Sequence, residues 1–195
     1  MTLPPVVRIF FAIDLPPETK HHLGKFISIL KKQSKSHAIR WTKPDNLHIT
    51  LQFLAEVRTE HLATLIKNVR AKIEGAMKAS SFSFGKLHLF PNPYRPRVIV
   101  LEITPQEVLA NLSQLIGHGI IASDYEIESR PFRAHLTLGR IKHAQGVSLN
   151  FLSECQIPEI GKVEMNDVVL FRSEPQPEGS KYTVIERIML NESVC

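Results

Sequence analysis

Two short strings in the chain repeat the same arrangement of chemically active residues. His48-Ile49-Thr50 and His135-Leu136-Thr137 each place a threonine two positions after a histidine. In a β-strand, residues two positions apart point to the same face of the sheet. Each string therefore presents one imidazole and one hydroxyl group to one side, while the apolar residue between them faces the other side.

Two such strands facing one cleft would surround a bound anion with two imidazoles and two hydroxyl groups. Because histidine titrates near neutrality, one neutral imidazole can take a proton from water while a protonated one gives a proton to a leaving oxygen. Threonine hydroxyls can donate hydrogen bonds to the oxygens on which charge develops. These groups suffice to open a cyclic phosphodiester. We therefore expect His48 and His135 as catalytic residues, and Thr50 and Thr137 as phosphate-binding residues.

Two other interpretations of the histidines must be weighed. A lone histidine on a strand is usually structural, and the chain contains nine histidines, so the repetition of the whole pattern is what favours catalysis. Two histidines could also begin a zinc site, but neither string has an adjacent cysteine or carboxylate. Asp45, the acid nearest to His48, falls in a predicted turn. We therefore expect no metal ion.

Hydrophobic periodicity predicts the elements that hold these strings. Apolar runs or alternation predict strands over residues 6–13, 47–55, 82–90, 98–103, 134–141, 163–171 and 182–190. Helical spacing of apolar residues predicts helices over 17–30, 59–75 and 108–116. The order is β-α-β-α-β-β-α-β-β-β, with no long linker. We expect one α+β domain spanning residues 1–195, in which sheets meet at a shared groove.

Composition sets broad limits on the environment of the protein. The 195 residues carry a formal net charge of +5, which suits an anionic ligand but is weak support by itself. The two cysteines, Cys155 and Cys195, are too few for a disulfide framework, so we expect free thiols. Neither a signal peptide nor an apolar run of transmembrane length is visible. We expect a cytoplasmic protein that is not bound to a membrane.

The strings lie within longer segments that resemble a known family. These segments are RIFFAIDLP at 8–16, NLHITLQFL at 46–54, RVIVL at 97–101, RPFRAHLTLGR at 130–140 and YTVIER at 182–187. Together they resemble the 2H phosphoesterase superfamily, and within it the RNA 2′,3′-cyclic phosphodiesterases formerly called 2′-5′ RNA ligases. One residue departs from the pattern, because Ala134 stands where the family commonly has proline.

The resemblance implies a bilobal fold with pseudo-twofold symmetry, in which two antiparallel-rich sheets flank a central cleft and the helices lie outside. It implies hydrolysis of RNA 2′,3′-cyclic phosphate ends to 2′-phosphates without a cofactor. In that scheme His48 protonates the leaving 3′ oxygen, His135 activates water, and Thr50 and Thr137 hold the phosphate. It also implies the joining of such an end to a 5′-hydroxyl through a 2′-5′ linkage.

Four flanking residues are further candidates. By resemblance, Arg140 would contact the phosphate, and Phe53 and Phe11 would stack on a base. Arg140 and Phe53 each lie five positions after a motif histidine, which in a regular strand is the opposite face. A bulge at Gly139, or the end of the strand, could reconcile position and role. Strand parity instead favours Arg133 as the phosphate-binding arginine.

The sequence is consistent with more than one ligand and with more than one function. The expected ligand is RNA with a 2′,3′-cyclic phosphate terminus, and a small cyclic nucleotide is the alternative for the same chemistry. A non-catalytic module that binds RNA or a nucleotide is a third possibility, although both histidines and both threonines are present. We expect a monomer that needs no protein partner.

Overall fold

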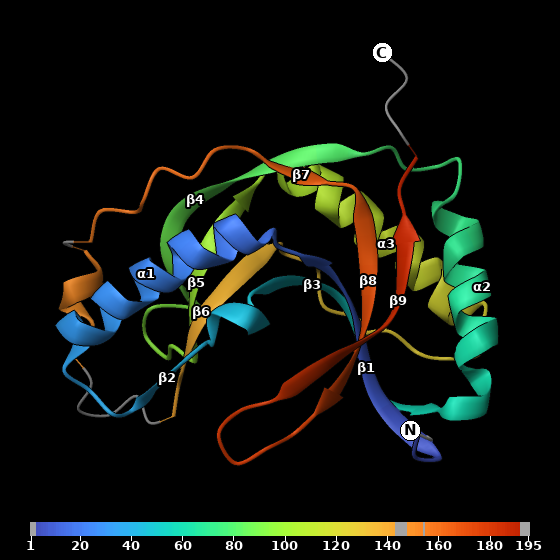
Figure 1. Cartoon of the computed structure of the whole chain (residues 1–195), viewed down its shortest axis with the longest axis horizontal. Helices are drawn as coiled ribbons and strands as arrows, with labels where there is room; N and C mark the ends of the chain where they lie inside the picture. Colours follow the sequence, from blue (N-terminus) through green and yellow to red (C-terminus); the bar gives the residue numbers. More distant parts are fainter. Residues whose placement is uncertain (1–2, 143–147, 154, 192–195) are drawn as a thin grey trace.

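The chain folds into two antiparallel sheets, as a computed structural model shows for residues 3–142, 148–153 and 155–191 (Figure 1). Cys195 lies outside these residues. The first sheet has the strand order β3 (His48–Arg58), β1 (Val6–Asp14), β8 (Asp167–Glu174) and β9 (Lys181–Met189). The second has the order β2 (Ile39–Trp41), β6 (His135–Ile141), β5 (Val98–Thr104), β4 (Ser80–Phe90) and β7 (Val163–Met165). The two motif strands, β3 and β6, therefore belong to different sheets.

Helices pack beside both sheets. They are α1 (Pro17–Ser34), α2 (Leu62–Ile73) and α3 (Gln106–Ile121), with short 3₁₀ turns η1 (Pro44–Asn46), η2 (Thr59–His61) and η3 (Asn150–Leu152). In Figure 1, α1 lies on the side of β2, β5 and β6, while α2 lies on the opposite side of the molecule, beyond β9. No helix among the described residues is both long and apolar enough to cross a lipid bilayer.

Alternation along β1 gives the first sheet two covered faces. Ile9, Phe11 and Ile13 have at most 2% of their surface exposed and belong to the main hydrophobic core. Phe10 and Ala12 face the other side, where they pack in a second, smaller apolar cluster. This second cluster lies on the same face as the histidine of β3, because Ala12 pairs with Thr50.

The predicted α+β class and the three predicted helices are confirmed, while one predicted strand needs correction and one strand was missed. Residues 163–171 do not form a single strand, because the strand is interrupted at Asn166 and its two parts join different sheets as β7 and β8. Strand β2 was not predicted. Its three residues are too few for alternation to be recognised, and it is held by pairing with β6.

The close crossing of α2 and α3 depends on a glycine. A Cβ atom at Gly119 would lie only 2.5 Å from the Cα atom of Val69, so the backbones themselves are in contact. We expect Gly119→Ala to destabilise the fold by about 1–3 kcal/mol, even though alanine favours a helix, because the helices must separate. Chemical denaturation measures this difference.

Gly161→Ala is the matched control, since a Cβ atom at Gly161 meets no heavy atom within 4 Å. It should change stability by no more than about 0.5 kcal/mol. Equal stability of the Gly119→Ala and Gly161→Ala variants would contradict this account of the helix crossing.

Candidate active site

The two motif strands meet at the boundary between the sheets. Strands β3 and β6 are in contact although they belong to different sheets, and in Figure 1 they lie next to each other in the middle of the molecule. His48 is the first residue of β3 and His135 is the first residue of β6. The repeated strings therefore occupy equivalent positions in the two halves of the structure.

Both histidines are held by the same backbone hydrogen bond. His48 Nδ1 lies 2.7 Å from the carbonyl oxygen of Asn46, and His135 Nδ1 lies 2.7 Å from that of Arg133. A carbonyl oxygen only accepts, so each Nδ1 carries a proton and donates it. Each Nε2 is then the ring nitrogen that carries no proton when the imidazole is neutral. At His48 this atom is 3.0 Å from Thr50 Oγ1, the hydroxyl of the same motif.

A bulge follows the motif in β3. Adjacent residues of β1 pair with Thr50 and with Gln52, which leaves Leu51 as an extra residue between them. The extra residue reverses the alternation, so Phe53 returns to the face of His48 and Thr50 instead of pointing into the core. This bulge resolves the conflict between parity and the expected position of Phe53, whose surface is 42% exposed.

A matching bulge follows the motif in β6. Adjacent residues of β5 pair with Thr137 and with Gly139, and Leu138 is the extra residue. Arg140 thereby reaches the same face as Thr137. A bulge was expected at Gly139, and the extra residue is the one just before it. A Cβ atom at Gly139 would lie 3.1 Å from the ring of Trp41, so a larger residue would disturb this packing.

A groove of about 360 Å³ opens beside the first motif. Its lining includes His48, Thr50 and Arg140, together with Phe53 and Tyr182. Strand pairing places His135 and Thr137 on the same face of β6 as Arg140, although they do not line this groove itself. Residues of both sheets thus line this one groove.

The structure settles where two of the flanking candidates lie. Phe11 has no exposed surface and belongs to the main core, so its expected stacking on a base is wrong. Its neighbour Phe10 faces the groove instead. Arg133 precedes β6, its side chain is exposed and does not line the groove, and it reaches the site through its backbone carbonyl group. Arg140 is therefore the better placed arginine.

Three aromatic rings surround the imidazole of His48. The Phe10 ring centroid lies 4.7 Å away, that of Tyr182 lies 5.2 Å away with its edge toward the imidazole, and that of Phe171 lies 6.3 Å away. Because this burial penalises the charged form, it lowers the pKa of His48 from its ordinary value of 6.5 to about 4. His48 is thus neutral at pH 7 when the groove is empty.

Charged groups behind His48 partly oppose this effect. Asp14 pairs with His48 across the strands, and its carboxylate, like the hydrogen bond to Asn46, raises the pKa of the imidazole. The same carboxylate is held by Lys20 at 2.6 Å and by Arg187 at 3.5 Å. Lys20 lowers the pKa of His48, so this ion pair weakens the influence of Asp14.

The surroundings of His135 follow a similar plan with fewer aromatic contacts. Its ring stacks on Phe90, with centroids 5.5 Å apart and an interplanar angle of 14°. Its cross-strand partner is Glu102, as Asp14 is for the first histidine. The Glu102 carboxylate lies 3.6 Å from His88 Nε2. Each motif histidine therefore has a carboxylate residue opposite it on the neighbouring strand.

Sequence reasoning missed the aromatic residues that enclose His48. Phe10 could have been found, because alternation places it on the face opposite Phe11. Phe171 and Tyr182 could not, because they come from β8 and β9 and depend on the strand order of the folded sheet. Nor did the sequence indicate Arg40, which reaches the groove on the unpredicted strand β2.

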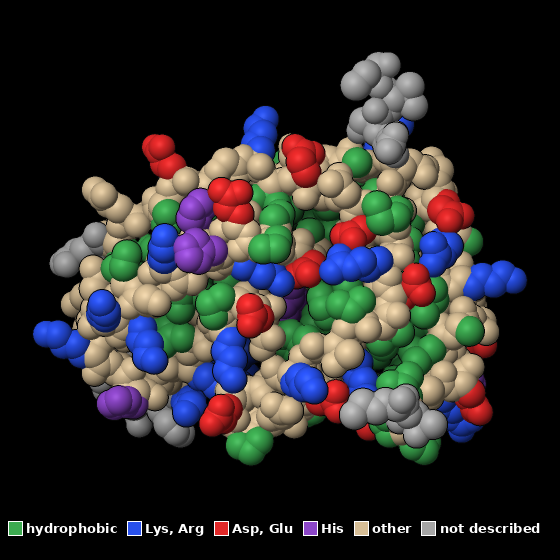
Figure 2. Space-filling view, in the orientation of Figure 1, with side chains coloured by type: hydrophobic (Ala, Val, Ile, Leu, Met, Phe, Trp, Pro, Cys, Tyr) green, Lys and Arg blue, Asp and Glu red, His purple; other side chains and the backbone are tan. Residues whose placement is uncertain are grey.

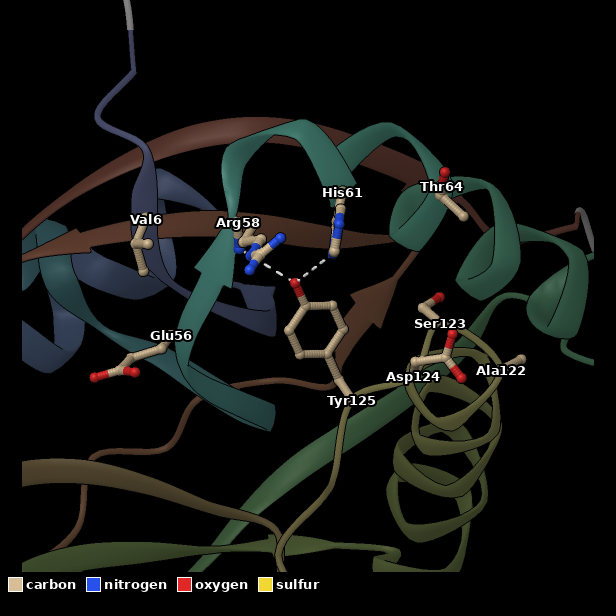
Figure 3. Close-up of a pocket in the computed structure, with 9 residues that line it drawn as sticks. All are labelled: Val6, Glu56, Arg58, His61, Thr64, Ala122, Ser123, Asp124 and Tyr125. Carbon is tan, nitrogen blue, oxygen red and sulfur yellow. Dashed lines mark hydrogen bonds between the residues drawn. The ribbon is translucent and has the colours of Figure 1, made fainter.

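A second hollow of about 590 Å³ lies away from the motifs (Figure 3). Its prominent contact is the Tyr125 hydroxyl, which accepts a hydrogen bond from the Arg58 backbone and lies 2.9 Å from His61 Nδ1. These bonds attach the segment after α3 to the end of β3. The hollow contains neither motif, and its charged residues have mixed signs, so we assign it no catalytic role.

Within the described ranges, no three side chains of His, Cys, Asp or Glu lie close enough to form a metal site. The carboxylates nearest to the motif histidines are engaged by other side chains, Asp14 by Lys20 and Glu102 by His88.

Comparison with known proteins identifies a family and relatives of similar length. The model of the family described as LigT like Phosphoesterase matches residues 13–100, which include the first motif. A protein of Methanothermobacter thermautotrophicus, named RNA 2′,3′-cyclic phosphodiesterase, is 30% identical over 182 residues, covering 92% of this chain and 97% of the relative. A protein of Archaeoglobus fulgidus with the same name is 29% identical, covering 90% and 96%.

Solved structures agree with these relatives. The crystal structure of E. coli LigT in its apo form superposes with a TM-score of 0.74 at 26% identity, covering 96% of this chain and 99% of that one. The structure of E. coli LigT complexed with 3′-AMP gives a TM-score of 0.73 at 25% identity, with coverages of 95% and 98%. The bilobal arrangement of two sheets is therefore shared over about 95% of this chain.

Burial of His48 makes the stability of the fold depend on pH. The unfolded chain binds a proton on this residue below about pH 6.5, whereas the folded protein binds it only near pH 4. Stability is therefore fully present above this window and falls as the pH drops from 6.5 to 4, by up to about 3 kcal/mol from this group. Chemical denaturation across this range measures the loss.

His48→Gln removes the titrating group and should flatten this part of the profile, while His22→Gln, on the exposed face of α1, should leave it unchanged. A His48→Gln profile as steep as that of the wild type would contradict the assigned burial effect.

Proposed function

The chain belongs to the family of LigT-like phosphoesterases, and from this premise we propose that it hydrolyses RNA 2′,3′-cyclic phosphate ends to 2′-phosphate ends without a metal ion. The main support is the matched hydrogen bond of the two motif histidines. It keeps a proton on each Nδ1 and thereby leaves each Nε2 as the atom that would exchange protons with the substrate. The names of the relatives and the presence of both complete motifs support the same chemistry.

In the proposed reaction, water attacks the phosphorus atom as the bond between phosphorus and O3′ breaks. His135 Nε2 takes the proton of the attacking water, and His48 Nε2–H gives a proton to the departing O3′. One proton is taken and one is given, so the two imidazoles exchange protonation states in each turnover. With an RNA 5′-hydroxyl in place of water, the same steps would form a 2′-5′ linkage.

The phosphate is proposed to be held by the hydroxyl groups of Thr50 and Thr137 and by the guanidinium group of Arg140. These groups would donate hydrogen bonds to the non-bridging oxygens, where negative charge increases as the nucleophile attacks. The side chain of Arg140 is close enough to His48 to lower the pKa of that imidazole in the empty groove. Phe53, on the same face of β3 as His48 and Thr50, supplies an exposed aromatic surface for the terminal base.

The role of His48 as an acid requires a proton that the empty site disfavours. Burial keeps this imidazole neutral near pH 7, and Arg140 and Lys20 oppose its charge further. A cyclic phosphate carries a negative charge, and an anion a few ångströms from an imidazolium stabilises it. We therefore propose that His48 takes up its proton together with the substrate, and that the anion also offsets the charge of Arg140.

The remaining expectations belong to the same proposal. The protein would work as a monomer in the cytoplasm, and an RNA end rather than a small cyclic nucleotide would be its substrate. The basic groove supports an anionic polymer as ligand, since Arg8, Arg40, Lys43 and Arg140 line it with a single acid, Glu178.

Replacement of either motif histidine tests the proposal. We expect His48→Ala and His135→Ala each to reduce release of 2′-phosphate from a cyclic-ended oligoribonucleotide by at least about 10²–10⁴-fold, because each removes one proton transfer. Product analysis by chromatography measures this, with His22→Ala as the surface control and with EDTA present throughout.

Full activity of either motif variant, with the fold intact by circular dichroism, would show that the histidines do not carry the reaction. Loss of wild-type activity in EDTA would show that a metal ion is needed, against the proposal.

A further inference from the structure

The groove holds more positive charge than one cyclic phosphate requires. Four basic side chains line it, and only Arg140 is used in the proposed reaction. Arg8 enters from β1, Arg40 from β2, and Lys43 from the turn before η1. The other three basic residues therefore need a separate explanation.

Arg40 has an unusual position beside Arg140. The two residues are direct cross-strand partners on β2 and β6. Ile39, the preceding residue, is buried, so Arg40 lies on the opposite, groove-facing side of its strand. Like charges directly opposite each other on neighbouring strands destabilise a sheet. This arrangement therefore costs stability unless an anion lies between or beside the two guanidinium groups.

No protein group supplies that anion. Within residues 3–142, 148–153 and 155–191, neither Arg40 nor Arg140 forms a hydrogen bond or an ion pair through its side chain. The single acid of the groove lining, Glu178, lies 3.8 Å from Lys43, and both side chains are largely exposed. Such an exposed pair contributes little and can exchange for a ligand.

A cation also lies on the other side of the groove, which is formed by β1 and β3. The Arg8 guanidinium lies over the ring of Phe53, 5.3 Å from its centroid. This contact orients the cation on the same wall that offers an aromatic surface for a base. In the space-filling view, Lys and Arg side chains are frequent on the lower left part of the face, where Figure 1 places β2 (Figure 2).

We propose that Arg40, assisted by Lys43 and Arg8, forms a second phosphate site for the phosphate 5′ of the nucleoside that carries the cyclic phosphate. Arg140 lies on the strand with the second motif, and Arg40 lies one strand farther out, about 4.8 Å away. A ligand with two phosphates on one ribose can thus engage both arginines. This inference rests on the proposed function and narrows its substrate to 5′-phosphorylated or polymeric ligands.

Binding of reaction products tests the second site without requiring catalysis. Isothermal titration compares adenosine 2′-phosphate with adenosine 2′,5′-bisphosphate, which differ by one phosphate. We expect the bisphosphate to bind the wild type about tenfold to a hundredfold more tightly, as a charge-assisted hydrogen bond would give. In Arg40→Ala this ratio should fall to less than about threefold, and Arg40→Lys should retain part of it.

Arg95→Ala is the matched control, because Arg95 is an exposed arginine on the loop between β4 and β5 and does not line the groove. It should keep the wild-type ratio. The dinucleotide ApA with a 2′-phosphate end distinguishes the two sources of the second phosphate. If the dinucleotide binds as tightly as the bisphosphate, the second site accepts the internucleotide phosphate of RNA. If the dinucleotide binds more weakly, the site is specific for a terminal 5′-phosphate.

Equal affinities of the wild type for adenosine 2′-phosphate and the bisphosphate would overturn the second site, as would an unchanged ratio in Arg40→Ala. Hydrolysis assays of the histidine variants are independent of these ratios. A protein that shows the ratios but no hydrolysis would keep the second site and refute the proposed reaction.

Discussion

The hydrogen bond from each histidine Nδ1 to the carbonyl oxygen two residues earlier is the constraint on which the site depends. It fixes which ring nitrogen carries the proton and leaves Nε2 of His48 and His135 for proton exchange. Both β3 and β6 begin at their histidine, so the accepting carbonyl group lies just before the strand in each case. The fold thus supplies two equivalent imidazoles on strands from different sheets that are in contact.

The environments of these two imidazoles differ even though their backbone bonds match. Aromatic rings from β1, β8 and β9 enclose His48 and keep it neutral, while the aromatic contact of His135 among the described residues is with Phe90. The proposed reaction needs one of these imidazoles to be protonated and the other to be neutral when the substrate is bound. We propose that a bound anion supplies this condition, because it would offset both the burial of His48 and the positive charge of Arg140.

The sequence predicted the motif residues and the fold class because alternation is a local property. Alternation alone could not place Phe53 and Arg140, which were indicated by resemblance, since each depends on a bulge that is defined by pairing with another strand. Sequence reasoning misplaced Phe11 for a simpler reason, because the resemblance indicated an aromatic residue of the first strand and alternation would have selected Phe10. Arg40 was missed because β2 is a strand only through its contact with β6.

Both motif histidines are proposed to act on one phosphate. Nuclear magnetic resonance of the imidazole nitrogens, recorded while adenosine 2′-phosphate is added, tests it most directly. The account predicts that one equivalent of ligand shifts the Nε2 signals of both His48 and His135, and that the pKa of His48 rises from about 4 toward neutrality. Signals that change for only one histidine, or a His48 that stays neutral at pH 6 with ligand bound, would contradict it.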